Sequence, residues 1–187
     1  MKRRTVLKRL AAVPLLASLP GRVGAAPETD AKNVEALQRD WKMFLAADAD
    51  IALTTEPLRR SDQEWQKTLS RTQYYVMRKE GTETSFSSPL NDEKRPGVYV
   101  CAGCSLPLFT SAMKFDSGTG WPSFFTTIPG VFGTKRDFLL IFPRTEYHCV
   151  RCGSHHGHVF DDGPKPTGLR YCNNGVALRF IPKTGTA

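Results

Sequence analysis

Five cysteines are the residues of this chain whose types and spacing most clearly suggest chemistry. Four of them form two Cys-x-x-Cys pairs, Cys101 with Cys104 and Cys149 with Cys152, and 44 residues separate the pairs. Two such pairs offer four soft sulfur ligands with the local spacing of tetrahedral zinc in structural sites. The pattern therefore predicts one structural zinc ion, and it leaves Cys172 over.

Cys172 needs a separate explanation. It lies between Arg170 and Asn174 in a run that is otherwise polar. A solitary cysteine can be an inert core residue or a reactive thiol, and its surroundings decide which. The polar neighbours favour a reactive thiol.

The first 25 residues have the organisation of an export signal. A basic start at residues 2–4 precedes a short apolar stretch at residues 10–19, and small residues precede a cleavage point expected after Ala25. The run Arg3-Arg4 followed by Thr5 resembles a twin-arginine signal, which predicts an exported, periplasmic protein. An uncleaved anchor and a general secretory signal are the alternatives, although the apolar stretch is short for a membrane helix.

The positive charge of the chain is mostly a property of this signal. It holds six of the 26 Lys and Arg residues and no acid, so the remaining chain has 20 basic against 18 acidic residues, a net charge of +2 instead of +8. A nucleic-acid partner is therefore not expected, because binding phosphates needs a basic surface on the folded domain. Stable membrane insertion after removal of the signal is not expected either.

Export also bears on the state of the cysteines. Thiols delivered unfolded to an oxidising compartment tend to become disulfides, whereas a domain folded around its metal arrives with its thiolates bound. Twin-arginine export carries folded proteins, so the signal and the zinc site support each other. Oxidation of the two pairs to disulfides is the alternative.

The rest of the chain divides into a helical preface and a β-domain. Apolar residues at helical spacing predict an amphipathic helix over residues 31–47, followed by a linker to residue 60. Capping-box patterns at residues 61–64 and 70–73 predict two short helices, the second ending at Gly81. Beyond Gly81, short apolar runs such as 97–100 and 138–142 predict antiparallel strands, with both cysteine pairs on connecting turns.

Several motifs occur in a fixed order along the β-domain. They are Cys101-Ala102-Gly103-Cys104, Lys114-Phe115-Asp116-Ser117-Gly118, Gly120-Trp121-Pro122-Ser123-Phe124, Arg144-Thr145-Glu146, Gly157-His158-Val159-Phe160, Asp162-Gly163-Pro164 and Gly168-Leu169-Arg170-Tyr171-Cys172.

In the order and spacing of these motifs, residues 61–182 resemble the B-type methionine sulfoxide reductase family. The resemblance implies a mainly β fold, an antiparallel two-sheet, barrel-like domain with short N-terminal helices and a structural zinc held by four cysteines. It also implies reduction of the R epimer of methionine sulfoxide, with oxidised methionine in proteins or peptides as the substrate. Residues 26–60 and the tail at 183–187 lie outside the resemblance.

The resemblance assigns Cys172 as the nucleophile that attacks the sulfoxide sulfur and becomes a sulfenic acid. His158 matches the catalytic imidazole that protonates the sulfoxide oxygen, and His155 matches its partner histidine. Asp162 is a candidate to orient His158.

Three more residues complete the expected site. Asn174 matches an asparagine that orients the reacting atoms, although a turn asparagine would look the same. Arg170 is expected to keep the thiolate charged or to contact the sulfoxide, with a surface salt bridge as the alternative. Trp121 matches the aromatic wall for the S-methyl group of the substrate, with plain core packing as the alternative.

Two further histidines, His148 and His156, lie where the family pattern has none. All four histidines fall between residues 148 and 158, which could indicate a second metal site. Because four thiolates already complete a zinc site, we expect His148 and His156 to be solvated surface residues.

The chain departs from the family near the nucleophile. Thr119 stands where many members have a resolving cysteine, and Asn173, Gly175 and the pair Tyr147-His148 are also unusual. A sulfenic acid at Cys172 must then react with an external thiol, from a thioredoxin-like or glutaredoxin-like protein or a small molecule. We expect a monomer. The alternative function is a zinc-stabilised β-domain that binds ligands without catalysis.

Overall fold

The computed structural model describes residues 31–138 and 143–183. The expected export signal, the predicted strand residues 139–142 and most of the C-terminal tail lie outside these ranges. Among the described residues, no helix is both long and apolar enough to cross a membrane.

The N-terminal helix is shorter than expected. Helix α1 (Ala31–Arg39) ends at Arg39, and the 3-10 helix η1 (Trp41–Phe44) follows it, so the prediction of one helix to residue 47 is wrong. Asp40 breaks the helix with φ −97° and ψ 19°, and its carboxylate accepts two hydrogen bonds from Arg39. Aspartate is a weak helix former because its side chain competes for polar partners. Residues 48–60 contain no helix or strand, as expected.

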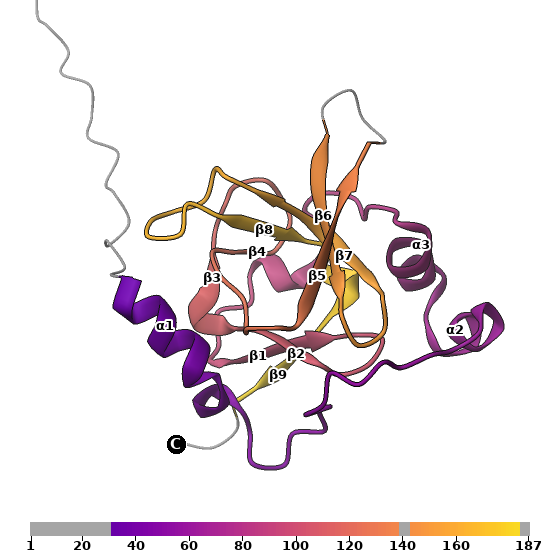
Figure 1. Ribbon diagram of the computed structural model, residues 1–187, viewed down its shortest axis with the longest axis horizontal. Helices are drawn as coiled ribbons and strands as arrows, with labels where there is room; N and C mark the ends of the chain where they lie inside the picture. The colour runs from indigo at the N-terminus through magenta and orange to yellow at the C-terminus, as the bar shows by residue number, and fades with distance from the viewer. Residues whose placement is uncertain (1–30, 139–142, 184–187) are drawn as a thin grey trace, which may run out of the picture.

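Both capping boxes are confirmed. Ser61 and Glu64 bond reciprocally at the start of α2 (Asp62–Thr68), and Ser70 and Gln73 do so at the start of α3 (Arg71–Lys79). Two otherwise unpaired backbone donors are satisfied at each start. Helix α3 ends at Lys79, two residues before Gly81, and the residue that caps it, Glu80, is in the left-handed conformation. Figure 1 shows α1 on one side of the β-domain and α2 with α3 on the other.

The β-domain consists of two antiparallel sheets, which confirms the mainly β fold. One sheet has the strand order β2-β1-β9 and the other β3-β4-β8-β7-β6-β5. Short 3-10 helices lie before the first strand at Pro89–Asn91 and between strands at Ser111–Met113 and Gly175–Ala177. The strands are β1 (Gly97–Cys101), β2 (Pro107–Thr110), β3 (Lys114–Phe115), β4 (Ser123–Phe124), β5 (Phe132–Asp137), β6 (Arg144–Cys149), β7 (His155–Phe160), β8 (Arg170–Asn173) and β9 (Leu178–Pro182).

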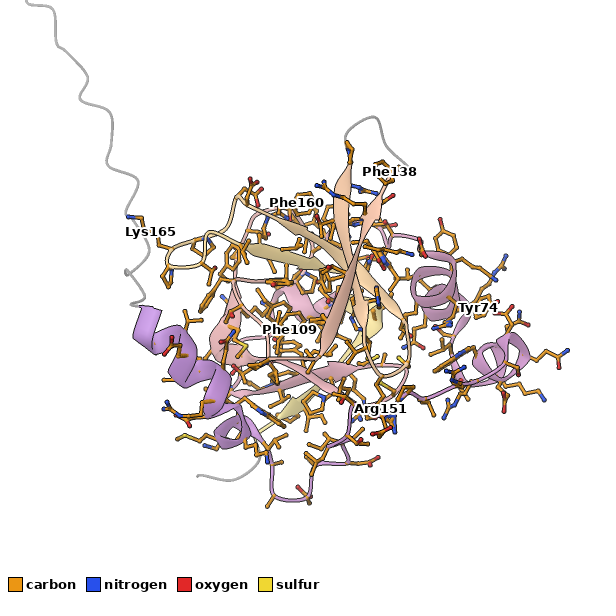
Figure 2. The ribbon with its side chains drawn as sticks, in the orientation of Figure 1. Tyr74, Phe109, Phe138, Arg151, Phe160 and Lys165 are labelled. Carbon is orange, nitrogen blue, oxygen red and sulfur yellow. The ribbon has the colours of Figure 1, made fainter. Side chains whose placement is uncertain are left out.

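Aromatic side chains join the two sheets in the core. The rings of Phe109 from β2 and Phe124 from β4 stack with centroids 3.9 Å apart, and Tyr99 from β1 meets Phe124 edge-on at 5.0 Å. All three residues are fully buried, and Phe109 lies in the middle of the domain in Figure 2. Such pairs contribute about 0.5–1.5 kcal/mol beyond their buried area. They hold the sheet with β1 against the sheet that carries Cys172.

Strand β7 contains one extra residue, His156, opposite the β6 step from Tyr147 to His148. In a regular strand, residues three apart point to opposite faces of the sheet. The extra residue shifts the alternation of side chains by one position, so two residues that lie three apart across it point to the same face. His155 and His158 therefore lie together, with ring centroids 5.5 Å apart.

Gly157 lets β7 approach the strand that carries Cys172. Gly157 pairs with Asn173 on β8, and a Cβ built at residue 157 would lie 1.9 Å from the Cys172 carbonyl oxygen. No side chain fits at that distance. The close pairing of the two strands therefore requires glycine at this position.

Candidate functional site

The four paired cysteines converge on one point, as their spacing predicts. Cys101 is the last residue of β1 and Cys149 the last of β6, and Cys104 and Cys152 lie in the turns that follow, so each pair lies where one strand turns into the next. The Sγ atoms of Cys101 and Cys152 are 3.6 Å apart, those of Cys104 and Cys149 are also 3.6 Å apart, and all four lie within 4.8 Å of one another.

These distances fit a metal ion and not disulfides. Four sulfurs around a tetrahedral zinc, each about 2.3 Å from it, lie about 3.8 Å from one another, whereas disulfide sulfurs are about 2.0 Å apart. All five cysteines are free. Hydrogen bonding from Cys101 lowers the pKa of the Cys104 and Cys152 thiols, and hydrogen bonding from Cys104 raises the pKa of Cys101. Two of the four thiols therefore ionise more readily than a free cysteine.

Two polar side chains outside the four cysteines contact the sulfur atoms of this cluster. The Ser154 hydroxyl lies 3.3 Å from Cys152 Sγ, and His156 Nε2 lies 3.4 Å from Cys101 Sγ. The expectation of a solvated His156 is wrong, because its side chain is fully buried beside the cluster. Burial lowers the pKa of His156 to about 4, so its imidazole is neutral. His148 is half-buried, with Nδ1 3.3 Å from Glu146.

The linker at residues 50–58 passes over both cysteine turns. Ala52 N donates to the Ser105 carbonyl beside Cys104, and Leu58 N donates to the carbonyl of Arg151, which lies between Cys149 and Cys152. Arg151 Nε in turn donates to the Thr54 carbonyl, and Figure 2 labels Arg151 at this edge of the domain. The linker thus connects the two turns that hold the cysteines.

Cys172 lies in a separate cleft. It occupies β8, where it pairs with Ser123 of β4 on one side and with His158 of β7 on the other. The cleft has a volume of about 130 Å³ and is lined by Thr82, Trp121, Arg144, His158, Phe160, Cys172 and Asn174. Four of the six residues expected in the substrate site therefore share one cavity, Trp121, His158, Cys172 and Asn174.

Arg170 lies two residues before Cys172 on the same strand. Burial raises the pKa of the Cys172 thiol, and the Arg170 guanidinium and the Thr119 hydroxyl oppose that rise. Arg170 stacks over Phe160, which forms part of the cleft, with 4.4 Å between guanidinium carbon and ring centroid. The charge of Arg170 therefore opposes the effect of burial on the pKa of Cys172.

The expectation that Asp162 orients His158 is wrong. Both carboxylate oxygens of Asp162 accept hydrogen bonds from Arg170 at 2.8 Å. His158 Nε2 lies instead 2.7 Å from Asp137, whose carboxylate also accepts a 2.6 Å hydrogen bond from Arg144. Burial lowers the pKa of His158, and Asp137 opposes that change.

His155 is buried behind His158 and is held by an acid that the sequence did not single out. Its Nδ1 lies 2.8 Å from Oε1 of Glu146 on the neighbouring strand. Burial alone would raise the pKa of Glu146, but hydrogen bonds from His155 and His148 bring it below its usual value. Nε2 of His155 has no partner among the described residues. The Glu146 carboxylate thus fixes the His155 ring, and the second ring nitrogen is buried without a hydrogen-bond partner among the described residues.

Glu83 holds three elements of the cleft together. Its side chain accepts hydrogen bonds from the backbone N–H groups of Gly175 at 2.5 Å and Val176 at 2.9 Å, shortly after Cys172 in the chain. Its backbone N–H donates to Asn174 Oδ1 at 3.0 Å, and its carbonyl accepts from Trp121 Nε1 at 3.2 Å. Asn174 Nδ2 donates to the His156 carbonyl. Burial raises the pKa of Glu83.

Sequence reasoning missed Glu83, Asp137 and a role for Glu146. Glu146 lies within one of the quoted motifs, so its presence there was a usable signal. Glu83 and Asp137 lie in ordinary polar runs, 91 and 21 residues from the side chains they contact. No local pattern marks such distant contacts.

A domain model described as the SelR domain matches residues 69–182. Peptide methionine sulfoxide reductase MsrB of Agrobacterium fabrum is 47% identical over 131 residues, which are 70% of this chain and 97% of that protein. Its counterpart in Bradyrhizobium diazoefficiens is 48% identical over 139 residues, 73% of this chain and 99% of that protein.

Plant relatives are longer than the matched region. Peptide methionine sulfoxide reductase B1, chloroplastic, of Arabidopsis thaliana is 52% identical over 121 residues, 64% of this chain. The match spans 60% of the length of that relative and 56% of the rice protein of the same name.

The environment of Cys172 predicts its reactivity in the free protein. Because burial raises its pKa, alkylation of Cys172 by iodoacetamide should increase with pH through a midpoint above that of free cysteine, about 8.5. Arg170→Met removes the opposing cation and should move the midpoint higher. Mass spectrometry of the peptide containing Cys172 measures the rate at each pH.

Arg179→Met is the matched control, since Arg179 contacts Asp50 and Ser105. It should leave the midpoint unchanged. A midpoint below that of free cysteine, or one that Arg170→Met does not raise, would contradict this description of the site.

Proposed function

The chain belongs to the SelR family of B-type peptide methionine sulfoxide reductases, and from that premise we propose that it is a peptide-methionine (R)-S-oxide reductase. Cys172 is its nucleophile, and oxidised methionine in proteins or peptides is its substrate. The observation that carries the proposal is one cleft that brings together a thiol, an imidazole and an indole, from Cys172, His158 and Trp121.

The chemical step conserves atoms and charge. The Cys172 sulfur takes the oxygen of the sulfoxide and becomes a sulfenic acid, while the sulfoxide becomes a thioether. The oxygen needs one proton, and the thiol loses one. His158 lies on the strand next to Cys172 and shares its cleft, so it carries that proton to the oxygen. Arg144 donates a hydrogen bond to the Asp137 carboxylate, and that carboxylate holds the His158 ring in place.

Trp121 provides the binding surface for the methyl group of the substrate. Sulfur and the carbon atoms next to it pack favourably on aromatic rings. The hydrogen bond from Nε1 to the Glu83 carbonyl fixes the orientation of the indole. With Phe160 across the same cleft, a fixed ring can distinguish the two epimers at sulfur.

We propose zinc as the ion held by Cys101, Cys104, Cys149 and Cys152. Four thiolates in tetrahedral arrangement suit zinc, and a closed set of four ligands is characteristic of a structural ion. When bound, the ion links two strand-connecting turns and contributes to folding. The oxidation and reduction steps take place at Cys172.

The function is tested with a peptide that contains racemic methionine sulfoxide and with dithiothreitol as reductant. Consumption should stop near half, with the S epimer left over on chiral chromatography. Cys172→Ser should lower the rate by about a thousandfold or more while retaining the metal and the folded spectrum. Cys101→Ser should first lose the metal and the thermal stability.

Two outcomes would contradict the proposal. Full activity in both variants would exclude Cys172 chemistry. Saturable binding of the sulfoxide peptide without thiol consumption would favour the alternative, a zinc-stabilised binding module.

We also propose that an external thiol regenerates Cys172. Thr119 contacts Cys172 through its hydroxyl, and it occupies the place of the resolving cysteine. The other four cysteines form the metal cluster. A first external thiol displaces water from the sulfenic acid to form a mixed disulfide, and a second thiol releases the Cys172 thiol. A thioredoxin-like or glutaredoxin-like protein or a small thiol supplies both.

After one turnover without reductant, dimedone should label Cys172, and the metal should remain bound. Thr119→Cys provides the matched comparison, because it places a second thiol at the contact and should give an internal disulfide in place of the label. Mass spectrometry distinguishes these products. A disulfide from Cys172 to Cys101 or Cys152, with release of metal, would refute the one-cysteine cycle.

We propose export to the periplasm by the twin-arginine route, on the basis of the pattern in residues 1–25. Replacing Arg3 and Arg4 together by Lys should leave a full-length precursor inside a bacterial host, whereas Arg9→Lys should still be exported. Immunoblots of cell fractions measure this. Export of both variants would favour the general secretory route, and an unprocessed membrane-bound form would favour an anchor.

A further inference from the structure

His156 is a buried residue to which the proposed reaction gives no role. It is the extra residue of β7, and its carbonyl accepts hydrogen bonds from the backbone N–H of Asn174 at 2.8 Å and from Asn174 Nδ2 at 3.0 Å. The backbone of His156 is therefore fixed beside the substrate cleft.

The side chain of His156 is directed away from the cleft, toward the cysteine cluster. Its Nε2 lies 3.4 Å from Cys101 Sγ, and its Nδ1 has no hydrogen-bond partner among the described residues. The rings of Phe132 and Tyr147 lie 5.5 Å and 6.4 Å from the imidazole between centroids. The sulfur is thus the partner of Nε2, in a pocket that otherwise packs aromatic rings around the histidine.

A thiolate that binds a metal keeps lone pairs that accept N–H hydrogen bonds, and such outer contacts orient the ligand. A neutral imidazole has one N–H, at either Nδ1 or Nε2. By distance and angle only Nε2 has a hydrogen-bond partner, the Cys101 sulfur, although the Asn173 side chain also acts on the pKa of the imidazole. Ser154 makes the corresponding hydroxyl contact with Cys152, so two of the four sulfurs have a polar neighbour on the same chain segment.

We propose that His156 is a positioning residue for the metal, which donates its Nε2–H to the Cys101 thiolate and fixes that ligand. The proposal rests on the metal site proposed above, but it does not depend on catalytic activity. It also assigns a role to a histidine that the four-cysteine ligand set leaves unused.

The rate at which a chromogenic chelator removes metal from the zinc-loaded protein tests the proposal. His156→Leu fills the pocket without an N–H donor and should release the metal about 10–100-fold faster. His156→Gln keeps a donor near the position of Nε2 and should restore much of the retention. Circular dichroism of both variants, with metal bound, checks that they are folded.

A second measurement uses the unaltered protein and so remains decisive if the variants fail to fold. Nitrogen NMR of the histidine rings reports which nitrogen carries the proton, and in the cadmium-substituted protein His156 Nε2–H should show scalar coupling to the metal through the sulfur. A proton on Nδ1 would overturn the proposal, as would equal metal release from the Leu variant and the unaltered protein. A chain that takes up no metal would instead refute the metal site itself.

Discussion

Strand β7 runs so close to β8, the strand of Cys172, that residue 157 has no room for a side chain. The Cys172 carbonyl occupies the position that a Cβ at Gly157 would need. One residue earlier, the extra residue His156 changes the alternation of side chains, which places His155 and His158 together. His156 also contacts both Asn174 and Cys101. The arrangement of His155, His158, Asn174 and Cys101 therefore depends on the local geometry of three residues on β7.

Buried carboxylates hold this geometry in place. Glu83, Asp137 and Glu146 are all buried, and an isolated buried charge is costly. Each accepts hydrogen bonds: Glu83 from the backbone of Gly175 and Val176, Asp137 from Arg144, and Glu146 from the imidazole of His155. Removing one partner would leave the other group unsatisfied, at a cost of about 1–3 kcal/mol or more for charged groups. These pairs therefore favour one arrangement of the cleft over alternatives.

Local patterns predicted much of this structure. The capping boxes at Ser61 and Ser70, the cysteine turns and the antiparallel strands all depend on residues near one another in sequence, and the structure contains them. The errors involve distant contacts. Asp162, four residues after His158, was expected to orient that ring, but strand pairing brings Asp137 to the ring instead. His156 was expected at the surface because four thiolates already complete a zinc site, and no sequence rule identifies the extra residue on β7 that turns its side chain to the cysteine cluster.

The two groups of thiols differ in what oxidation would cost the protein. Binding of a structural zinc contributes on the order of 10–16 kcal/mol in small zinc domains, and a disulfide to Cys172 would remove one of the four ligands. That disulfide would stabilise the protein by only about 2–4 kcal/mol. This gain is much smaller than the free energy of metal binding that would be lost. An external thiol forms the same type of bond without that loss. The hydroxyl of Thr119, which acts on the pKa of Cys172, cannot form a disulfide, so these free energies support the proposed regeneration of Cys172 by a reductant from outside the chain.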